Sequence, residues 1–207
     1  MSRTDEILNI LRTFIVPKGE LNWRNPYELL VAVVLSAQTT DKHVNQITVP
    51  LFEKYDTVYK LAQANVSDIK EIIKPLGLSD AKSRNISNLS RIIVERYNGI
   101  VPNTFKDLIS LPGVGRKTAQ VVLAVAFNTP ALPVDTHVER VSKRLGLAKK
   151  DDSVLDVELK LKRKINRNEW IDAHHLLLLF GRYYCKSAHP SCNNCKLKAY
   201  CKDIISK

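Results

Sequence analysis

The chain has 207 residues, of which 44% are hydrophobic and 26% charged, so it can bury a substantial core and is neither disordered nor fibrous. Lysine and arginine total 32 against 21 acidic residues, a formal net charge of +11. This charge favours nucleic acid as the partner, although a basic surface also serves solubility. Apolar runs in the predicted helices, such as 176–180, are far shorter than the roughly 20 residues of a membrane span. Residues 1–10 carry acids, unlike a secretory signal, so we expect a soluble, cytoplasmic protein.

Apolar residues recur at helical spacing along most of the chain, which predicts an all-α fold. The clearest stripes are Ile7, Leu8 and Leu11; Leu29, Leu30, Val33 and Val34; Ile69, Ile72 and Ile73; and Ile86, Leu89, Ile92 and Ile93. Period-two alternation is missing, and Asn98-Gly99 follows a helical pattern, so it is predicted to end a helix. Breaks at 17–19, 75–80, 98–103, 112–115, 129–133 and 149–153 leave nine or ten helices.

Two helix ends in the first half of the chain carry side chains with an ordinary structural interpretation. At 35–41 an apolar helix turns polar, and Gln38 is predicted to cap or brace its end. At 76–79 Leu78 follows a glycine that is predicted to end a helix. Leu78 is therefore predicted to make the apolar contact that accompanies a Schellman C-cap.

Residues 108–122, Leu-Ile-Ser-Leu-Pro-Gly-Val-Gly-Arg-Lys-Thr-Ala-Gln-Val-Val, predict a helix-hairpin-helix motif. The segment Gly113-Val114-Gly115-Arg116 would form the turn and open the second helix, where backbone N–H groups and the helix dipole favour a phosphate. Such a site binds the nucleic-acid backbone without reading sequence. The small Ala119 would allow close helix packing, and the alternative is an ordinary helical corner.

Lys117 lies in the first turn of the helix that follows the hairpin turn. Residues 119–127 are apolar nearly all round, so we expect this helix to be buried and its lysine to lie near low dielectric. Desolvation and the neighbouring Arg116 would both favour the neutral amine, which is the nucleophile that forms a Schiff base. Contact with a phosphate is the simpler role for this lysine.

Asp135 precedes a helix that runs through Val141, so it is predicted to be an N-cap. A carboxylate near the hairpin lysine could instead accept a proton or stabilise developing positive charge. His137 is equally open, with a place on the helix surface or in a hydrogen bond as the simpler interpretation.

All four cysteines lie near the C-terminus, separated by six, two and five residues: Cys185, Cys192, Cys195 and Cys201. This clustering indicates a metal site, because four thiolates can hold an iron-sulfur cubane or a tetrahedral zinc. Zinc sites usually show two close pairs, whereas one Cys-x-x-Cys is present here, which favours iron and sulfur. Lysines around the cluster would place positive charge beside a phosphate backbone, or form a solvated surface.

Together these motifs resemble the endonuclease III family of bacterial DNA glycosylases, over nearly the whole chain. Three signatures agree in order and distance: LPGVGRKTA, VDTHV and Cys-x6-Cys-x2-Cys-x5-Cys, where the family carries a 4Fe-4S cluster. The resemblance implies two helical lobes flanking a DNA cleft. One is a six-helix lobe, 22–132, with the hairpin near 108–122; the other joins 1–21 to 133–207 around the cluster. It also implies a monomer that acts on duplex DNA at the bacterial nucleoid.

The resemblance further implies that Lys117 attacks C1′ of an oxidised pyrimidine nucleotide and that Asp135 assists base departure and proton transfers. The resulting Schiff base would allow β-elimination 3′ to the lesion. Gln38 and Leu78 would fill the gap left by the flipped nucleotide, and Gly113, Val114, Gly115, Arg116 and His137 would contact DNA. The cluster would be structural or would contact DNA.

Departures from the family pattern, Gln120 and Ser79-Asp80, put contacts to the opposite strand in doubt. An adenine glycosylase acting on mismatches is the nearest alternative, but that relative lacks the hairpin lysine and has a further C-terminal domain, whereas this chain ends six residues after Cys201. A non-catalytic DNA-binding module is disfavoured by Lys117 together with Asp135. A small electron-transfer protein would need neither the hairpin nor the basic surface.

Overall fold

The computed structural model describes residues 2–205, which form helices and no strand, so the predicted all-α class is confirmed. Within these residues there are twelve α-helices and three short 3₁₀ helices, more than the nine or ten helices expected. The additional helices are short, such as α4 (Val58–Gln63, 6 residues) and α12 (Lys202–Ile205, 4 residues), and the predicted first helix of the hairpin, α7 (Phe105–Ile109), has only 5 residues. One or two turns give too few apolar positions to show a helical period.

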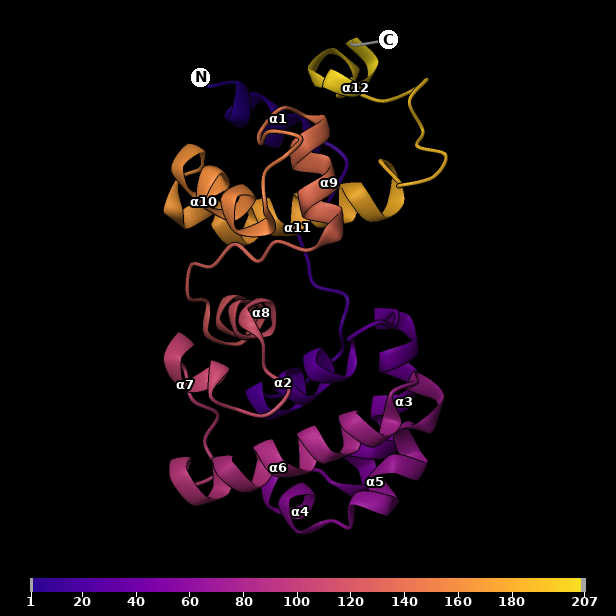
Figure 1. Cartoon of the computed structure of the whole chain (residues 1–207), viewed down its shortest axis with the longest axis vertical. Coiled ribbons are helices and arrows are strands. Elements are labelled where there is room, and N and C mark those ends of the chain that lie inside the picture. Colours follow the sequence, from indigo (N-terminus) through magenta and orange to yellow (C-terminus); the bar gives the residue numbers. More distant parts are fainter. Residues whose placement is uncertain (1, 206–207) are drawn as a thin grey trace. The chain divides into compact units, whose positions relative to one another are not determined.

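The chain divides into two compact units (Figure 1). The hairpin unit is Glu20–Thr129, and the terminal unit combines Met1–Gly19 with Pro130–Lys207. The helices of the hairpin unit are α2 (Pro26–Leu35), α3 (Asp41–Lys54), α4, α5 (Val66–Ile73), η1 (Lys74–Leu76), α6 (Ser79–Tyr97), α7 and α8 (Arg116–Phe127). The terminal unit has α1 (Arg3–Arg12), α9 (Thr136–Arg144), α10 (Val154–Lys164), η2 (Arg167–Glu169), α11 (Trp170–Tyr183), η3 (Lys198–Tyr200) and α12 (Lys202–Ile205).

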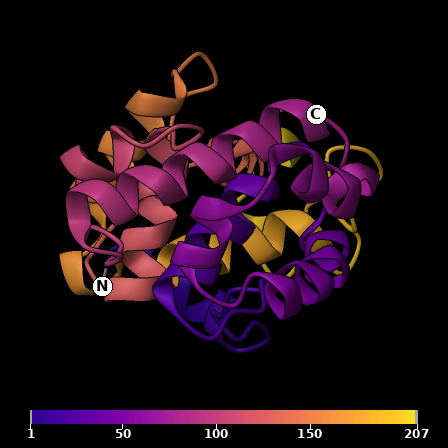
Figure 2. The same ribbon diagram turned by 90° about the horizontal axis from the view of Figure 1, so that it is seen from below.

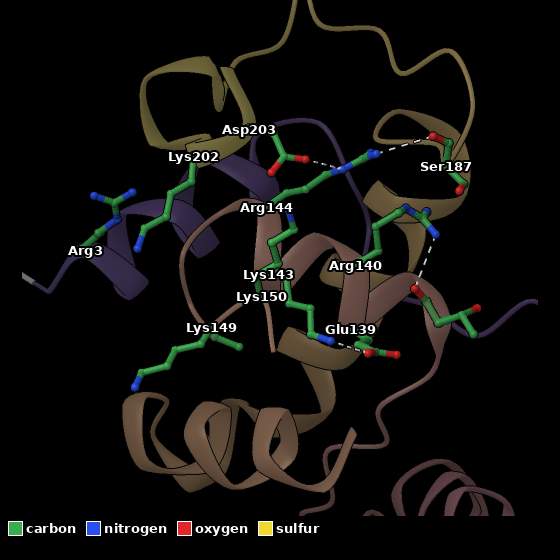
Figure 3. Close-up of a pocket in the computed structure, with 12 residues that line it drawn as sticks. Arg3, Glu139, Arg140, Lys143, Arg144, Lys149, Lys150, Ser187, Lys202 and Asp203 are labelled. Atoms are coloured by element: carbon green, nitrogen blue, oxygen red, sulfur yellow. Dashed lines mark hydrogen bonds and ion pairs between the residues drawn. The ribbon is translucent and has the colours of Figure 1, made fainter. Parts of the chain in front are cut away.

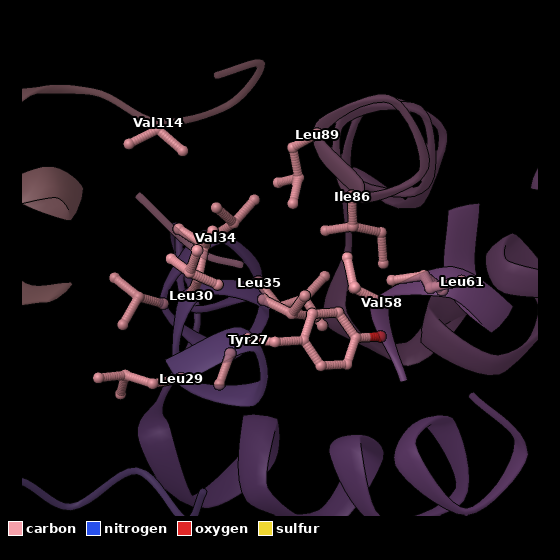
Figure 4. Packing of buried hydrophobic residues seen from close by; sticks show 14 of the residues in the cluster. Tyr27, Leu29, Leu30, Val34, Leu35, Val58, Leu61, Ile86, Leu89 and Val114 are labelled. Atoms are coloured by element: carbon pink, nitrogen blue, oxygen red, sulfur yellow. The ribbon is translucent and has the colours of Figure 1, made fainter. Parts of the chain in front are cut away.

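The hairpin unit is built around α2, which is buried along its whole length from Tyr27 to Leu35. Asn25 caps this helix by accepting a hydrogen bond from the Glu28 N–H, and Pro26 fits its first position. Side chains of α2 pack against the long helix α6 (Figure 4). Figures 1 and 2 show the ribbon of this unit in two views. The unit has seven α-helices rather than the six expected, since residues 58–73 form two short helices.

The core of the terminal unit lies where α1 and α9 pack on α11. Helix α9 can approach α11 closely because Gly181 has no side chain: a Cβ there would lie 2.9 Å from His137 Cβ and 3.1 Å from the His137 carbonyl oxygen. The apolar run 176–180 belongs to this core. None of the helices in the described chain is long and apolar enough to span a membrane.

Candidate functional site

The predicted hairpin motif is formed by α7, a turn and α8. Leu108, Leu111 and Val114 are buried and hold the turn against the core, and the Val114 N–H donates to the Leu111 carbonyl oxygen at 3.1 Å. Gly113 has φ +77°, and a Cβ there would lie 2.9 Å from the Asn85 amide nitrogen. Only glycine therefore fits this position without strain.

Helix α8 begins without a side-chain cap, because its N-cap residue is Gly115. Its first turn carries Arg116 and Lys117 and no acid. The Arg116 guanidinium carbon lies 5.4 Å from the centre of the Phe105 ring, which ties α8 to α7. An uncapped helix start next to two cations is a favourable environment for a phosphate.

Lys117 is exposed, so the prediction that its side chain lies in a low-dielectric environment is wrong. Residues deeper in α8 are buried, including Ala119 and Val122 at 0% exposure. The apolar stretch buries only the helix beyond its first turn. An exposed amine is accessible to a macromolecular substrate, as either a nucleophile or a phosphate contact.

Asp135 is the N-cap of α9, as its simpler interpretation predicted. Its Oδ1 accepts hydrogen bonds from the His137 and Val138 N–H groups, both at 2.9 Å. A carboxylate can accept about four hydrogen bonds. Capping is thus compatible with a role in proton transfer.

His137 is half-buried in the first turn of α9, with Nδ1 at 3.3 Å from an Arg140 guanidinium nitrogen. Arg140 in turn donates to the carbonyl oxygens of Gly181 at 2.7 Å and of Cys185 at 3.1 Å. Arg140 therefore links the start of α9 to the first residue of the cysteine segment.

Gln38 and Leu78 share a backbone feature that sequence reasoning did not anticipate. Both adopt the left-handed conformation, with φ of +59° and +50°, and both side chains are exposed. The predicted apolar capping contact of Leu78 is wrong, since 57% of its surface is exposed. A strained leucine that faces solvent needs surrounding structure to hold it.

The segment before Leu78 is held by Lys82 of α6. Lys82 is only 4% exposed, and its Nζ donates to the Leu76 carbonyl oxygen at 3.1 Å. Burial lowers the pKa of this lysine. A buried amine that binds one backbone carbonyl fixes the turn from which Leu78 projects.

The four cysteines line one cavity of about 1070 Å³ in the terminal unit and form no disulfide. Within residues 2–205, no three His, Cys, Asp or Glu side chains lie close enough together to hold a metal ion. Burial raises the pKa of the Cys195 thiol, and the neighbouring Cys185, Cys201 and Cys192 raise it further. Arg144 donates to Cys185 Sγ at 3.4 Å. Four thiols around one cavity are soft donors, which suit zinc or an iron-sulfur cluster rather than a hard cation.

Sequence reasoning missed Arg140 and Arg144, which hold the segment 185–187. Arg144 donates to the carbonyl oxygens of Lys186 at 2.8 Å and Ser187 at 3.4 Å and pairs with Asp203 at 3.1 Å. The two arginines are four residues apart and so lie on one face of α9. That spacing was the available signal.

Comparison with known proteins identifies the family to which the chain belongs. Residues 31–167 match the model of the family described as "HhH-GPD superfamily base excision DNA repair protein". The chain is 50% identical to endonuclease III of Bacillus subtilis (strain 168) over 184 residues, 89% of this chain and 84% of that protein.

Two solved structures also match, each at 45% identity and a TM-score of 0.94, covering all of this chain and 98% of theirs. One is a non-covalent endonuclease III–DNA complex and the other a trapped endonuclease III–DNA covalent intermediate. The fold and hairpin define the class, a base excision DNA repair glycosylase. Within that class, the chain belongs to the endonuclease III family.

Proposed function

We propose that this enzyme removes oxidised pyrimidines from duplex DNA and then cuts the strand 3′ to the abasic site through a Schiff base on Lys117. The observation that carries the proposal is the place of Lys117, exposed in the first turn of α8 directly after the Gly-x-Gly turn. The covalent DNA intermediate trapped in a 45% identical relative supports a mechanism in which the enzyme bonds covalently to DNA. Action on DNA also implies that the protein resides where the chromosome does.

In the first step, Lys117 Nζ attacks C1′ of the damaged nucleotide, and the base leaves with the electrons of the glycosidic bond. Opening of the sugar ring gives a protonated imine between Nζ and C1′. The imine acidifies the C2′ hydrogen, and loss of that proton expels the 3′ phosphate by β-elimination. Hydrolysis then frees the lysine and an unsaturated aldehyde.

Asp135 would serve as the acid-base group of this sequence. Because Oδ1 accepts hydrogen bonds from two backbone N–H groups, the carboxylate is held in one orientation. An ionised carboxylate can stabilise the positive charge that develops on the sugar and accept a proton from the attacking amine.

Gln38 and Leu78 would fill the space left when the nucleotide flips out of the duplex. Flipping costs a few kcal/mol, and side chains inserted into the stack offset part of that cost. Both side chains are exposed on left-handed backbone, which is strained for these residue types. Because an exposed side chain gains little from packing within the protein, a role in binding would account for the strain. The backbone of 113–116 and His137 would contact the DNA backbone.

Cys185, Cys192, Cys195 and Cys201 would hold a 4Fe-4S cluster. When bound, the cluster would supply a covalent cross-link among segments that otherwise contain only the short helix η3. It would thereby fix the basic loop carrying Lys186 and Lys196 for contact with phosphate.

Borohydride trapping tests the nucleophile. The wild-type protein should be captured covalently on duplex DNA carrying an abasic site or an oxidised pyrimidine, whereas Lys117→Ala should not. Lys106→Ala is the matched control, because Lys106 is another exposed lysine of the same hairpin motif. Trapping of Lys117→Ala at the wild-type level would refute the assignment.

Metal analysis tests the cluster. The purified protein should contain iron and acid-labile sulfide in near equal amounts, about four of each per chain. Substituting Cys192 and Cys195 with serine should remove both. Stoichiometric zinc in place of iron would overturn the cofactor while leaving the trapping result unaffected.

A further inference from the structure

A cavity of about 1070 Å³ lies along one face of α9 in the terminal unit (Figure 3). Its lining has seven basic side chains against two acidic ones, an excess of five positive charges. The basic residues are Arg3, Arg140, Lys143, Arg144, Lys149, Lys150 and Lys202. Both acids are already paired, Glu139 with Lys143 at 2.6 Å and Asp203 with Arg144 at 3.1 Å. The cavity therefore lacks the anions that would balance it.

Lys149 and Lys150 are the clearest sign of a missing ligand. Both side chains are exposed, and no hydrogen bond or ion pair joins either ammonium to a described residue, although Lys149 and the Asp152 carboxylate attract each other electrostatically. Their backbone is nevertheless fixed, since the Lys149 N–H donates to Asp152 Oδ2 at 2.6 Å and Asp152 is bound by Lys160. Neighbouring cations on ordered backbone repel one another unless an anion lies between them.

Other parts of the lining are held in place as well. The N–H groups of Leu147 and Ala148 both donate to the Ser142 carbonyl oxygen, at 2.8 and 3.2 Å, which fixes the turn after α9. Arg3 donates to the Tyr200 carbonyl oxygen at 2.8 Å. A ligand would meet a backbone and an Arg3 side chain that are already ordered, so the conformational entropy lost on binding would come mainly from the two exposed lysines.

The shape and composition of the lining favour a polymeric phosphate ligand. The basic residues on α9 extend from Arg140 to Arg144 and continue to 149–150, a span longer than a single phosphate group. None of the twelve lining residues is aromatic, so the cavity offers no surface on which a base could stack. Thr136 lines one end of the cavity and directly follows Asp135.

We infer that this cavity binds backbone phosphates of duplex DNA in the arm flanking the lesion. It would be a phosphate site in addition to the hairpin and to the loop of Lys186 and Lys196, and like that loop it belongs to the terminal unit. The inference rests on the proposed function, because it takes damaged DNA as the substrate. It adds contacts that no motif of the sequence predicted.

Binding to duplexes with arms of increasing length tests the site. The central nucleotide is a tetrahydrofuran analogue of an abasic site, which cannot form a Schiff base. The cavity variant carries both Lys149→Glu and Lys150→Glu. The control carries both Lys18→Glu and Arg163→Glu, which makes the same charge change at exposed residues of the same unit outside the cavity. The wild-type affinity should rise once one arm reaches the cavity. The cavity variant should lose that rise, roughly 10- to 100-fold, and the slope of log affinity against log salt should fall by about 2.

Three results would overturn the inference. The cavity variant and the control could lose the same affinity, which would show an effect of net charge alone. The cavity variant could lose as much affinity on the shortest duplex as on the longest, or the wild-type affinity could be independent of arm length. Inorganic tripolyphosphate could instead compete with the duplex for the wild type but not for the cavity variant, while duplex affinity does not depend on arm length. That result would reassign the site to a free polyphosphate. Borohydride trapping at saturating abasic DNA separates the two proposals. The cavity variant should be trapped like wild type, and failure of the wild type to be trapped would count against Lys117 alone.

Discussion

Helices α8 and α9 each begin beside a proposed catalytic side chain, yet their first turns are opposite in charge and capping. Helix α8 starts at Gly115 with no side-chain cap and with Arg116 and Lys117 in its first turn. Helix α9 starts at Asp135, whose carboxylate accepts two of its N–H groups. Cations at a helix N-terminus are unfavourable, whereas an anion there is stabilising.

The comparison indicates a division of tasks. The start of α9 supplies its own anion and is complete in the free protein. The start of α8 gives up that stabilisation and so remains suited to an anion from outside, such as a DNA phosphate. Four substitutions at or near these helix starts should have effects of decreasing size on activity, binding or stability.

Asp135→Asn separates capping from chemistry at α9. Asparagine caps helices about as well as aspartate, so stability should change by less than about 1 kcal/mol. The proton transfers proposed for the carboxylate would be lost, and base release under single-turnover conditions should slow roughly 10²- to 10⁴-fold. Asp151→Asn, at an exposed acid of the same unit, should react normally. Unchanged rates for Asp135→Asn would leave this residue with the capping role alone.

Gly113→Ala should damage the turn that presents α8. The residue has φ +77°, and the added Cβ would meet the Asn85 side chain at 2.9 Å, so a cost of about 2 kcal/mol is expected. Thermal unfolding should occur roughly 4–8 °C lower. Gly115→Ala is the matched control: its φ is −87° and nothing lies within 4 Å of a Cβ there, so its stability should stay within about 0.5 kcal/mol of wild type. Similar melting curves for both variants would contradict this account of the turn.

Most of the fold could be predicted because it depends on local patterns. Apolar stripes at helical spacing identified the long helices such as α6, and the Gly-x-Gly turn identified the hairpin. The short helix α4 was missed because a helix of one or two turns gains its stability from packing, which periodicity does not record.

The site was predictable only where its signal is local in the sequence. Asp135 follows from its place before a helix, and the cysteines from their spacing. The exposure of Lys117 was misjudged because the apolar run begins only two residues later, at Ala119, and a helix changes its facing side within a turn. The left-handed backbone of Gln38 and Leu78 was not foreseen, since no side-chain pattern favours that conformation in leucine or glutamine.

Gly115→Asp would give α8 the kind of start that α9 has. The backbone at 115 is extended, with ψ 177°, and offers open space for a side chain. A carboxylate there should cap the helix and offset Arg116 and Lys117, raising stability by about 0.5–1 kcal/mol. It should also repel phosphate, and affinity for undamaged duplex should fall roughly tenfold or more. Gly115→Asn caps without the charge, so it should gain stability with a smaller loss of binding. A gain in both properties for Gly115→Asp would show that the α8 start does not bind phosphate.

Helix α6 provides a third kind of start, because its N-cap residue is Leu78 with φ +50° and no side-chain cap. Leu78→Gly should relieve the left-handed strain and raise stability by about 0.5–1 kcal/mol, the smallest effect of the four. Binding to the tetrahydrofuran duplex should nevertheless weaken, since the side chain proposed to enter the duplex is gone. Tyr59→Ala is a suitable comparison, as it removes another exposed hydrophobic side chain of the same unit. A stabilised Leu78→Gly protein with undiminished affinity would mean that the strain at this helix start serves something other than DNA.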